Sequence, residues 1–199
     1  MGRHADPELA DRRRRQIMDA AIACFARRGF HQATMQEICA ESGISAGALY
    51  RYFASKAEII AAIAEDKRGE GHDAFQCAAK QKGLMDALCV VARDFFDKLH
   101  QGHSALIADV IAESIRDDAL AKSLRANDAG SVGLVANAIR SAQARHEIDA
   151  TLDADEAAAT LHAVIEGIGL RRAFLRDTDP DAALLQFRAV AERYLRPRP

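Results

Sequence analysis

Apolar side chains recur every three or four positions along most of this chain, which is the spacing of amphipathic helices. The first such stretch places four side chains on one face: Ile17, Ala21, Cys24 and Phe25. Runs of β-branched or aromatic residues are scarce. No proline lies between Pro7 and Pro180, so the residue that most reliably ends helices is missing there. The pattern predicts an all-α protein with about nine helices.

Capping residues divide the N-terminal segment into short helices. After a first helix that runs to Arg28, Thr34 is placed to cap a second, and Glu37 three positions later completes a capping box. Ser45 is expected to cap a third helix and Ser55 a fourth, with a glycine turn between the second and third. This spacing is typical of a helix-turn-helix.

Longer helices follow this segment. We expect them over residues 56 to about 81, 84–100, 104–116, 118–146, 155–175 and 181–195. Gly130 and Gly133 fall inside the fourth of these ranges, so we expect a kink or a break there.

The charge is unevenly distributed although the net charge of the chain is only −2. Residues 1–56 contain nine basic and six acidic side chains, a net charge of +3, whereas residues 57–199 have a net charge of −5. A basic N-terminal segment on an acidic body fits a module that meets phosphate groups. The hydrophobic fraction of 49% excludes a globally disordered chain.

The cysteines do not form a ligand or redox motif. They are widely spaced, without a CxxC pair, at Cys24, Cys39, Cys77 and Cys89. We expect buried free thiols rather than a disulfide or a metal site, and neither a metal nor another cofactor. The N-terminal residues lack the apolar stretch of a signal peptide, and no segment approaches the length of a membrane span. The expected location is therefore the cytoplasm, without membrane contact.

The third helix has two contrasting faces. Leu49 and Phe53 share one face and are expected to pack onto the first two helices, whereas Tyr50 and Arg51 point away. The small residues 46–48 begin the exposed face. A helix that enters a DNA major groove needs this clearance near its N-terminus.

Residues 16–68 carry a longer pattern of small, aromatic and capping residues. The pattern is Ala20-Ala21-x3-Phe25-x3-Gly29-Phe30, then Thr34-x3-Ile38-Cys39-x3-Gly43-Ile44-Ser45, then Gly47-x-Leu49-Tyr50-x-Tyr52-Phe53-x-Ser55-Lys56. It resembles the DNA-binding domain of the tetracycline-repressor (TetR) family. The resemblance implies a DNA-binding domain over residues 10–70, with its helix-turn-helix over 34–53, and a helical effector-binding and dimerisation domain over 71–199.

The function implied by the resemblance is a ligand-responsive transcriptional regulator, most often a repressor. A homodimer would bind a palindromic operator in double-stranded DNA and be released by a small-molecule effector. The resemblance places DNA contacts at ten positions: Thr34, Gln36, Ser45, Ala46, Gly47, Ala48, Tyr50, Arg51, Tyr52 and Lys56.

Two alanines depart from the family pattern, in which lysine is frequent at the positions of Ala46 and Ala54. Base reading is therefore expected to depend on Gln36, Arg51 and DNA shape. For Tyr52, the alternative to a DNA contact is a place mainly in the hydrophobic core. The basic run over residues 12–15 is expected to touch phosphates in part, with a solvated helix face as the alternative.

The resemblance also implies an effector pocket between the helices of the second domain. Its candidate lining residues are Phe75, Met85, Cys89, Phe95, Phe96, His100, Ile107 and Ile111. For any one of them, an ordinary place in the core is the alternative. His100 and His103 have the spacing of a metal pair, but no third ligand is near in the sequence, so we interpret them as surface histidines.

A dimer interface is expected on the last two helices. The segment that begins at Ile148 and the small residues around Gly167 resemble the family's interface loop and penultimate helix. Glycine in a helix interior costs about 1 kcal/mol relative to alanine, and close approach of a neighbouring helix would offset that cost at Gly167 and Gly169. The candidate interface residues are Ala159, Ala163, Glu166, Gly167, Gly169, Leu184, Phe187 and Ala191.

Two other classes of protein are alternatives to a transcriptional regulator. A helical enzyme could use carboxylates such as Glu113 and Asp117, but the sequence shows no nucleophile–base pairing, no phosphate loop and no glycine-rich fingerprint. A non-specific DNA-binding protein would fit the basic N-terminus but not the acidic body.

Overall fold

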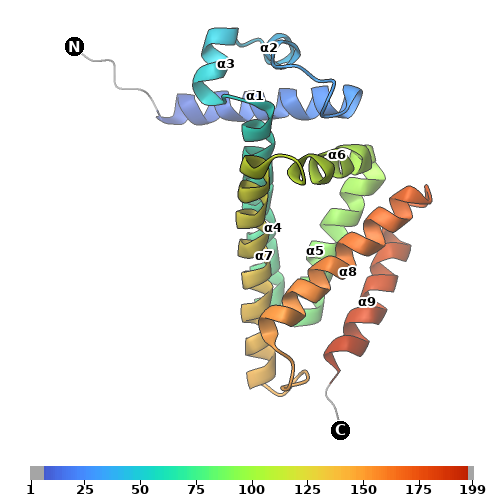
Figure 1. Cartoon of the computed structure of the whole chain (residues 1–199). Coiled ribbons are helices and arrows are strands. Elements are labelled where there is room, and N and C mark those ends of the chain that lie inside the picture. The colour runs from blue at the N-terminus through green and yellow to red at the C-terminus, as the bar shows by residue number, and fades with distance from the viewer. Residues whose placement is uncertain (1–6, 197–199) are drawn as a thin grey trace. The chain divides into compact units, whose positions relative to one another are not determined.

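The computed structural model describes residues 7–196, and this part of the chain is all-helical, without a strand. Residues 7–196 form nine α-helices, which Figure 1 labels, and one π-helical turn, η1. Their bounds are α1 Pro7–Arg28, α2 Met35–Ser42, α3 Ala46–Tyr52, α4 Lys56–Lys82, α5 Leu84–Lys98, η1 Leu99–His103, α6 Ser104–Ser114, α7 Asp118–Ala144, α8 Ala154–Phe174 and α9 Pro180–Leu195. The predicted all-α class is confirmed. No helix in this range is long and apolar enough to cross a membrane.

Local hydrogen bonds explain where the short N-terminal helices begin and end. The Thr34 hydroxyl accepts the Glu37 backbone N–H at 3.2 Å, and the Glu37 carboxylate accepts the Thr34 N–H at 2.9 Å, which makes the predicted capping box. Gly43 ends α2 with a φ of 64°, a left-handed conformation that suits glycine. At the start of α4 the Ser55 hydroxyl accepts the Glu58 N–H, as expected of a cap.

Two local expectations were wrong. Ser45 occupies the N-cap position of α3, but its side chain makes no capping hydrogen bond. Helix α7 runs without a break through Gly130 and Gly133, because two glycines among good helix formers lower helix stability without ending the helix. The irregular turn is η1 instead, where Gly102 has a φ of 93°.

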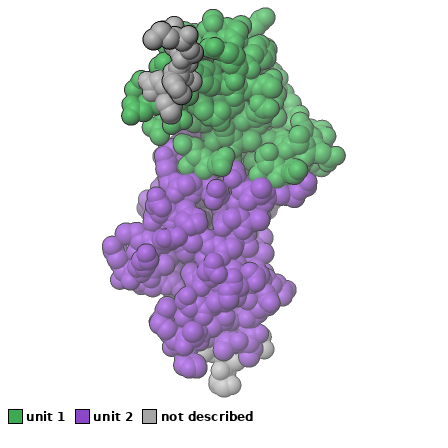
Figure 2. All heavy atoms as spheres, turned by 90° about the vertical axis from the view of Figure 1, so that its left-hand side faces the viewer, with its two compact units in different colours: residues 1–66, 105–124 green, residues 67–104, 125–199 purple. Residues whose placement is uncertain are grey.

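The chain forms two compact units, which Figure 2 colours separately. Unit 1 comprises residues 1–66 and 105–124, and unit 2 comprises residues 67–104 and 125–199. Helices α4 and α7 contribute to both. The N-terminal unit is therefore not contiguous, because α6 and the first turns of α7 join it from far along the sequence.

The core of unit 1 fixes the first three helices and the start of α4. All four apolar residues expected on the inner face of α1 are buried. They pack with Phe30, Ile38, Leu49, Phe53, Ile59 and, from the α7 segment, Leu120. Burial of so many large apolar side chains, each worth about 1.5–3 kcal/mol, gives this small unit its stability.

The core of unit 2 is built from α5, α8 and α9 with parts of α4 and α7. Its largest fully buried side chains are Phe75, Leu88, Phe96, Ile139, Leu161 and Phe187. Gly169 of α8 lies so close to α5 and η1 that a Cβ atom there would be 2.6 Å from both Leu99 Cδ1 and Phe95 Cε1. Its small size is required by packing within this unit. Nothing lies within 4 Å of a Cβ at Gly167.

The cysteines are free thiols with different surroundings. Cys24 is buried, Cys39 and Cys89 are half-buried, and Cys77 is exposed, so the expectation of burial is wrong for Cys77. Desolvation raises the pKa of Cys24 and of Cys89. Among residues 7–196, no group of three or more histidine, cysteine or carboxylate side chains is placed to hold a metal ion.

The two glycines of α8 should respond oppositely to alanine. Gly169→Ala should lower the free energy of unfolding by about 1 kcal/mol, because overpacking of about 1–3 kcal/mol exceeds the gain in helix propensity. Gly167→Ala should raise it by about 0.5–1 kcal/mol, since its new methyl group meets open space. Urea unfolding of both variants at one protein concentration measures the difference, and equal stabilities would contradict the packing described for Gly169.

Candidate DNA-binding site

Helix α3 presents one face to the core of unit 1 and the other to solvent. Leu49 and Phe53 are buried, whereas Gly47 and Arg51 are exposed and Tyr50 is 54% exposed. Figure 1 shows α3 beside α1 and α2. The side chains expected to meet DNA are therefore accessible, on a helix whose other face is fixed.

Two polar side chains of α1 hold the ends of α2 and α3. The Arg14 guanidinium donates to the Tyr52 carbonyl oxygen at 3.4 Å and lies 4.5 Å from the centre of the Phe53 ring. The Gln16 amide donates to the Ser42 carbonyl oxygen at 2.6 Å. Arg14 thus belongs to the internal support of α3, which corrects the expectation of phosphate contact for this member of the basic run. The sequence pattern did not single out Gln16.

Two cations at the end of α1 already have acidic partners. Arg27 pairs with Glu41 at 2.6 Å and Arg28 with Glu37 at 3.1 Å, so both tie the end of α1 to α2. Arg51 on α3 is different: it is exposed, and the described residues offer it no side-chain hydrogen bond or ion pair. A cation with these properties is available to an external anion.

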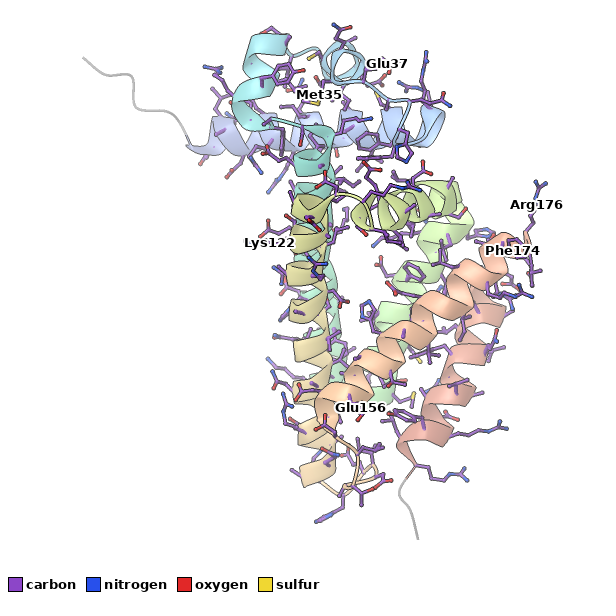
Figure 3. The ribbon with its side chains drawn as sticks, viewed as in Figure 1. Met35, Glu37, Lys122, Glu156, Phe174 and Arg176 are labelled. Carbon is purple, nitrogen blue, oxygen red and sulfur yellow. The ribbon has the colours of Figure 1, made fainter. Side chains whose placement is uncertain are left out.

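The start of α2 is closed by its own capping box. Both hydrogen-bond donors of Thr34, its N–H and its hydroxyl, are directed to the Glu37 carboxylate, at 2.9 and 3.1 Å. The hydrogen bond from the Thr34 backbone, with further help from its hydroxyl and from Arg28, lowers the pKa of Glu37. Figure 3 labels Glu37 at this helix start. Both donors of Thr34 are thus used within the chain, and its predicted phosphate contact stays a prediction.

Lys56 also has an internal role. Its ammonium group donates to the carbonyl oxygens of Phe30 and His31, at 2.6 and 3.0 Å, and lies 4.9 Å from the centre of the Phe30 ring. Burial lowers the pKa of Lys56, although Glu113 and Glu37 act in the opposite direction. This group therefore holds the turn between α1 and α2, and its predicted contact with the DNA backbone stays a prediction.

The remaining predicted DNA residues divide by exposure. Gln36, Ser45 and Ala46 are exposed. Ala48 and Tyr52 are half-buried and pack against the core of unit 1, so the core alternative for Tyr52 describes much of its side chain. Seven of the ten predicted DNA residues are therefore exposed: Thr34, Gln36, Ser45, Ala46, Gly47, Tyr50 and Arg51.

The predicted effector-pocket residues belong to both units, and their common lining stays a prediction. Phe75 and Phe96 are fully buried in the unit 2 core. Met85 and Phe95 pack against that core, and Cys89 is half-buried. The other three predicted lining residues are His100 in η1 and Ile107 and Ile111 on α6.

One ring nitrogen of His100 and one of His103 lie within hydrogen-bond distance of the backbone. The His100 Nδ1 atom lies 3.2 Å from the Thr178 carbonyl oxygen, and the His103 Nδ1 atom lies 3.1 Å from the Lys98 carbonyl oxygen. Both rings therefore hydrogen-bond within unit 2. His100 is exposed and His103 half-buried, so the surface interpretation fits His100 better.

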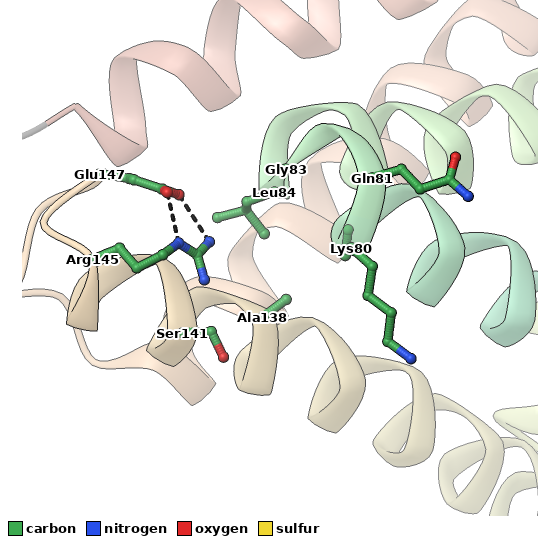
Figure 4. Close-up of a pocket in the computed structure, with 9 residues that line it drawn as sticks. Lys80, Gln81, Gly83, Leu84, Ala138, Ser141, Arg145 and Glu147 are labelled. Atoms are coloured by element: carbon green, nitrogen blue, oxygen red, sulfur yellow. Dashed lines mark hydrogen bonds and ion pairs between the residues drawn. The ribbon is translucent and has the colours of Figure 1, made fainter.

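One cavity of unit 2 lies where α4 turns into α5, against the end of α7 (Figure 4). Its volume is about 490 Å³. None of the predicted pocket residues lines it; its lining residues are Ala79, Lys80, Gln81, Gly83, Leu84, Ala138, Ser141, Arg145 and Glu147. Two hydrogen bonds, of 2.6 and 2.9 Å, join the Arg145 guanidinium to the Glu147 carboxylate at its edge.

The predicted interface residues lie on two sides of α8 and α9. Gly169, Phe187 and Ala191 are buried in the core of a single chain, which removes them from any interface with a second copy. The α8 residues that remain exposed are Ala159, Ala163, Glu166 and Gly167. Leu184 is half-buried.

Large apolar side chains beyond these candidate residues are also exposed at α8 and α9. Phe174 is 76% exposed at the end of α8, where Figure 3 labels it, and Leu185 of α9 is 71% exposed. Leu175 and Val190 are exposed as well. Their high exposure became evident only when the buried face of each helix was known.

Comparison with known proteins agrees with this architecture. Residues 17–63 match the family described as "Bacterial regulatory proteins, tetR family", and residues 90–196 match "BetI-type transcriptional repressor, C-terminal". The transcriptional regulator UidR of Escherichia coli K12 is 30% identical over 137 residues, which cover 68% of each chain.

Solved structures give the same result over nearly the whole chain. Salmonella enterica GusR superposes with a TM-score of 0.79 and 26% identity, covering 98% of this chain and 99% of the other. Bacillus subtilis FadR, solved in complex with stearoyl-CoA, shares the fold, with a TM-score of 0.71, 22% identity and coverage of 86% and 96%.

The exposed face of α3 and these matches define a ligand-responsive transcriptional repressor of the helix-turn-helix class. The chain belongs to the tetR family of bacterial regulatory proteins. Members of this family are transcriptional regulators rather than enzymes.

The capping box at α2 should make stability depend on pH. Because hydrogen bonds lower the folded-state pKa of Glu37, its carboxylate stabilises the fold above its ordinary pKa, and this contribution is lost as the pH falls through the lowered value. The difference in unfolding free energy between the native chain and Glu37→Gln should therefore be largest at neutral pH and shrink in acid. Urea unfolding across a pH series measures it.

The matched control is Glu65→Gln, at an exposed carboxylate of α4. Its stability should follow that of the native chain over the same pH series. A difference between Glu37→Gln and the native chain that stays constant with pH would contradict the role assigned to the Glu37 charge.

Proposed function

We propose that the exposed face of α3 reads one half of a palindromic operator in double-stranded DNA, and that two copies of the chain bind the two halves. The observation that supports this most directly is the exposure of Tyr50 and Arg51 on a helix clamped by Leu49 and Phe53. Helices of this kind enter the major groove with their first residues nearest the bases.

The side chains of this face divide into base-reading and backbone-contacting groups. Arg51, which has no side-chain partner within residues 7–196, suits a bidentate contact to guanine. The methyl group of Ala46 suits a thymine methyl, and Gln36 suits adenine. Tyr50 offers a hydroxyl to a phosphate, and so does the exposed guanidinium of Arg15 on α1.

Arg51→Ala should weaken operator binding by about 1–3 kcal/mol and relax the preference at one base pair of each half-site. Fluorescence anisotropy with operator variants at that base pair measures both effects. Arg116→Ala, which removes an equally exposed cation of unit 1 from outside α3, is the control and should change affinity by less than about threefold. Equal losses in the two variants would mean that Arg51 acts only through its charge.

A homodimer is supported by the apolar surface that α8 and α9 expose. Phe174 and Leu185 are large side chains with most of their area in solvent, and Leu175 adds to this surface. Soluble monomers rarely leave such side chains uncovered together. A two-fold dimer also gives the two recognition helices the symmetry of a palindrome, with half-sites about 34 Å apart.

Leu185→Glu should raise the dissociation constant of the dimer about a hundredfold, because it would bury an unpaired charge between the subunits. Sedimentation velocity over a concentration series measures the change. Ile115→Glu is the control, since Ile115 is 81% exposed and belongs to unit 1, whereas α8 and α9 belong to unit 2. A Leu185→Glu protein that stays dimeric would place the interface elsewhere.

We propose further that a small molecule bound by the second domain releases the operator. The complex of Bacillus subtilis FadR with stearoyl-CoA supports this for a protein of the same fold. The two carboxylates that a helical enzyme could have used, Glu113 and Asp117, make contacts within the fold instead. Glu113 lies 3.7 Å from His31, and Asp117 caps α7 by accepting two backbone N–H groups.

The test of the operator proposal is selection of bound DNA from a random pool with the full-length protein, followed by footprinting. We expect a palindromic sequence protected over two successive major grooves, with binding that weakens steeply as salt is added. Selection of no common sequence, or of a single unpaired half-site, would overturn the proposal.

A further inference from the structure

Two carboxylates of α6 reach the turn between α1 and α2. The Phe30 backbone N–H donates to Asp109 Oδ2 at 3.1 Å. One helical turn further along α6, Glu113 Oε2 lies 3.7 Å from His31 Nδ1, an ion pair whenever His31 is protonated. Both contacts lie within unit 1, although about eighty positions of sequence separate their partners.

The same turn is held from its other side by α4. Lys56 binds the carbonyl oxygens of Phe30 and His31, while Asp109 binds the Phe30 N–H, so donors and acceptors of the turn are satisfied by two different helices. Gly29 permits this approach: its φ is 78°, and a Cβ atom there would lie 3.2 Å from Asp109 Oδ2. The turn is therefore fixed by charged groups rather than by apolar burial alone.

This turn sets where α2 begins, and α2 leads directly into α3. A hydrogen bond between a backbone N–H and a charged carboxylate is stronger than a neutral one, so its loss frees the turn to move. Movement at the start of α2 misplaces Gln36 and, through the shared core, the exposed face of α3. Small displacements of a reading face are costly because base contacts require defined geometry.

We propose that Asp109 is a positioning residue for operator binding: it holds the α1–α2 turn in the DNA-reading geometry without touching DNA. The inference rests on the proposed function of α3. It assigns a DNA-binding role to a residue of α6, outside the segment that resembles the helix-turn-helix domain.

The sign of the charge makes the inference testable. Asp109 is an anion within the unit that meets DNA, so removal of its charge by itself would strengthen binding to a phosphate backbone. A positioning role predicts the opposite for the operator. Salt dependence also distinguishes the two effects. A residue that contacts no phosphate leaves the slope of log affinity against log salt concentration unchanged.

The experiment compares Asp109→Ala, Asp109→Asn and the native protein on the selected operator and on unrelated DNA, over a range of salt. Asp109→Ala should weaken operator binding roughly tenfold, which corresponds to about 1.4 kcal/mol, at an unchanged salt slope. Binding to unrelated DNA should stay equal or become tighter. Asp109→Asn keeps an oxygen that accepts the Phe30 N–H, so it should recover most of the lost affinity.

Asp118→Ala is the matched control, since it removes an exposed carboxylate of unit 1 at the start of α7. It should bind the operator as tightly as the native protein, or slightly tighter. Operator binding by Asp109→Ala at native strength, or equal weakness of Asp109→Asn and Asp109→Ala, overturns the inference. Failure of the native protein to select any operator would instead refute the proposed function.

A measurement on the unsubstituted protein covers the case in which Asp109→Ala does not fold. Amide hydrogen exchange followed by NMR should find the Phe30 N–H protected in the free protein, and more strongly protected in the operator complex. Exchange of this amide at the rate of an unstructured chain would show that Asp109 does not hold the turn, and would overturn the inference.

Discussion

The burial of Leu49 and Phe53 under α3 is the constraint on which the DNA-binding unit depends. Helix α3 has only seven residues, well below the roughly 12–15 at which an isolated helix becomes marginally stable in water. Tertiary contacts must therefore hold it, and they come from the apolar core, from Arg14 stacked on Phe53 and from the Gln16 bond to the end of α2. Because these packing contacts and hydrogen bonds all hold one face of α3, the side chains of its opposite face do not contribute to the fold and remain exposed.

Charge in unit 1 is used mainly to hold the unit together. Arg27, Arg28 and Lys56 each have internal acceptors, and Thr34 directs its donors to Glu37. An excess of basic residues near a helix-turn-helix therefore overstates the number available to phosphates. Arg51 is exposed, has no side-chain partner among residues 7–196 and lies on the reading face, where a cation contributes to specificity as well as to affinity.

Helix α8 of unit 2 has one side packed against its own chain and another side exposed. The side of α8 that contains Gly169 packs tightly on α5 and η1, while Ala163 and Gly167 lie on the exposed side. Large apolar residues, among them Phe174 and Leu185, extend the exposed surface. An inner face filled by its own chain leaves the outer face as the surface on which a second copy would be accommodated.

The sequence by itself determined the helices, their bounds within a few residues, the capping box at Thr34 and the outward face of α3, because caps and helical periodicity depend on residues only a few positions apart. Only the tertiary structure decided which cations have hydrogen-bond or ion-pair partners within the chain. It alone also decided that Asp109 accepts the Phe30 N–H and which side of α8 faces the core. Small apolar residues lie on both sides of α8, so periodicity cannot distinguish them. The partners of Arg14 and Asp109 are dozens of positions away, where local pattern holds no information about contact.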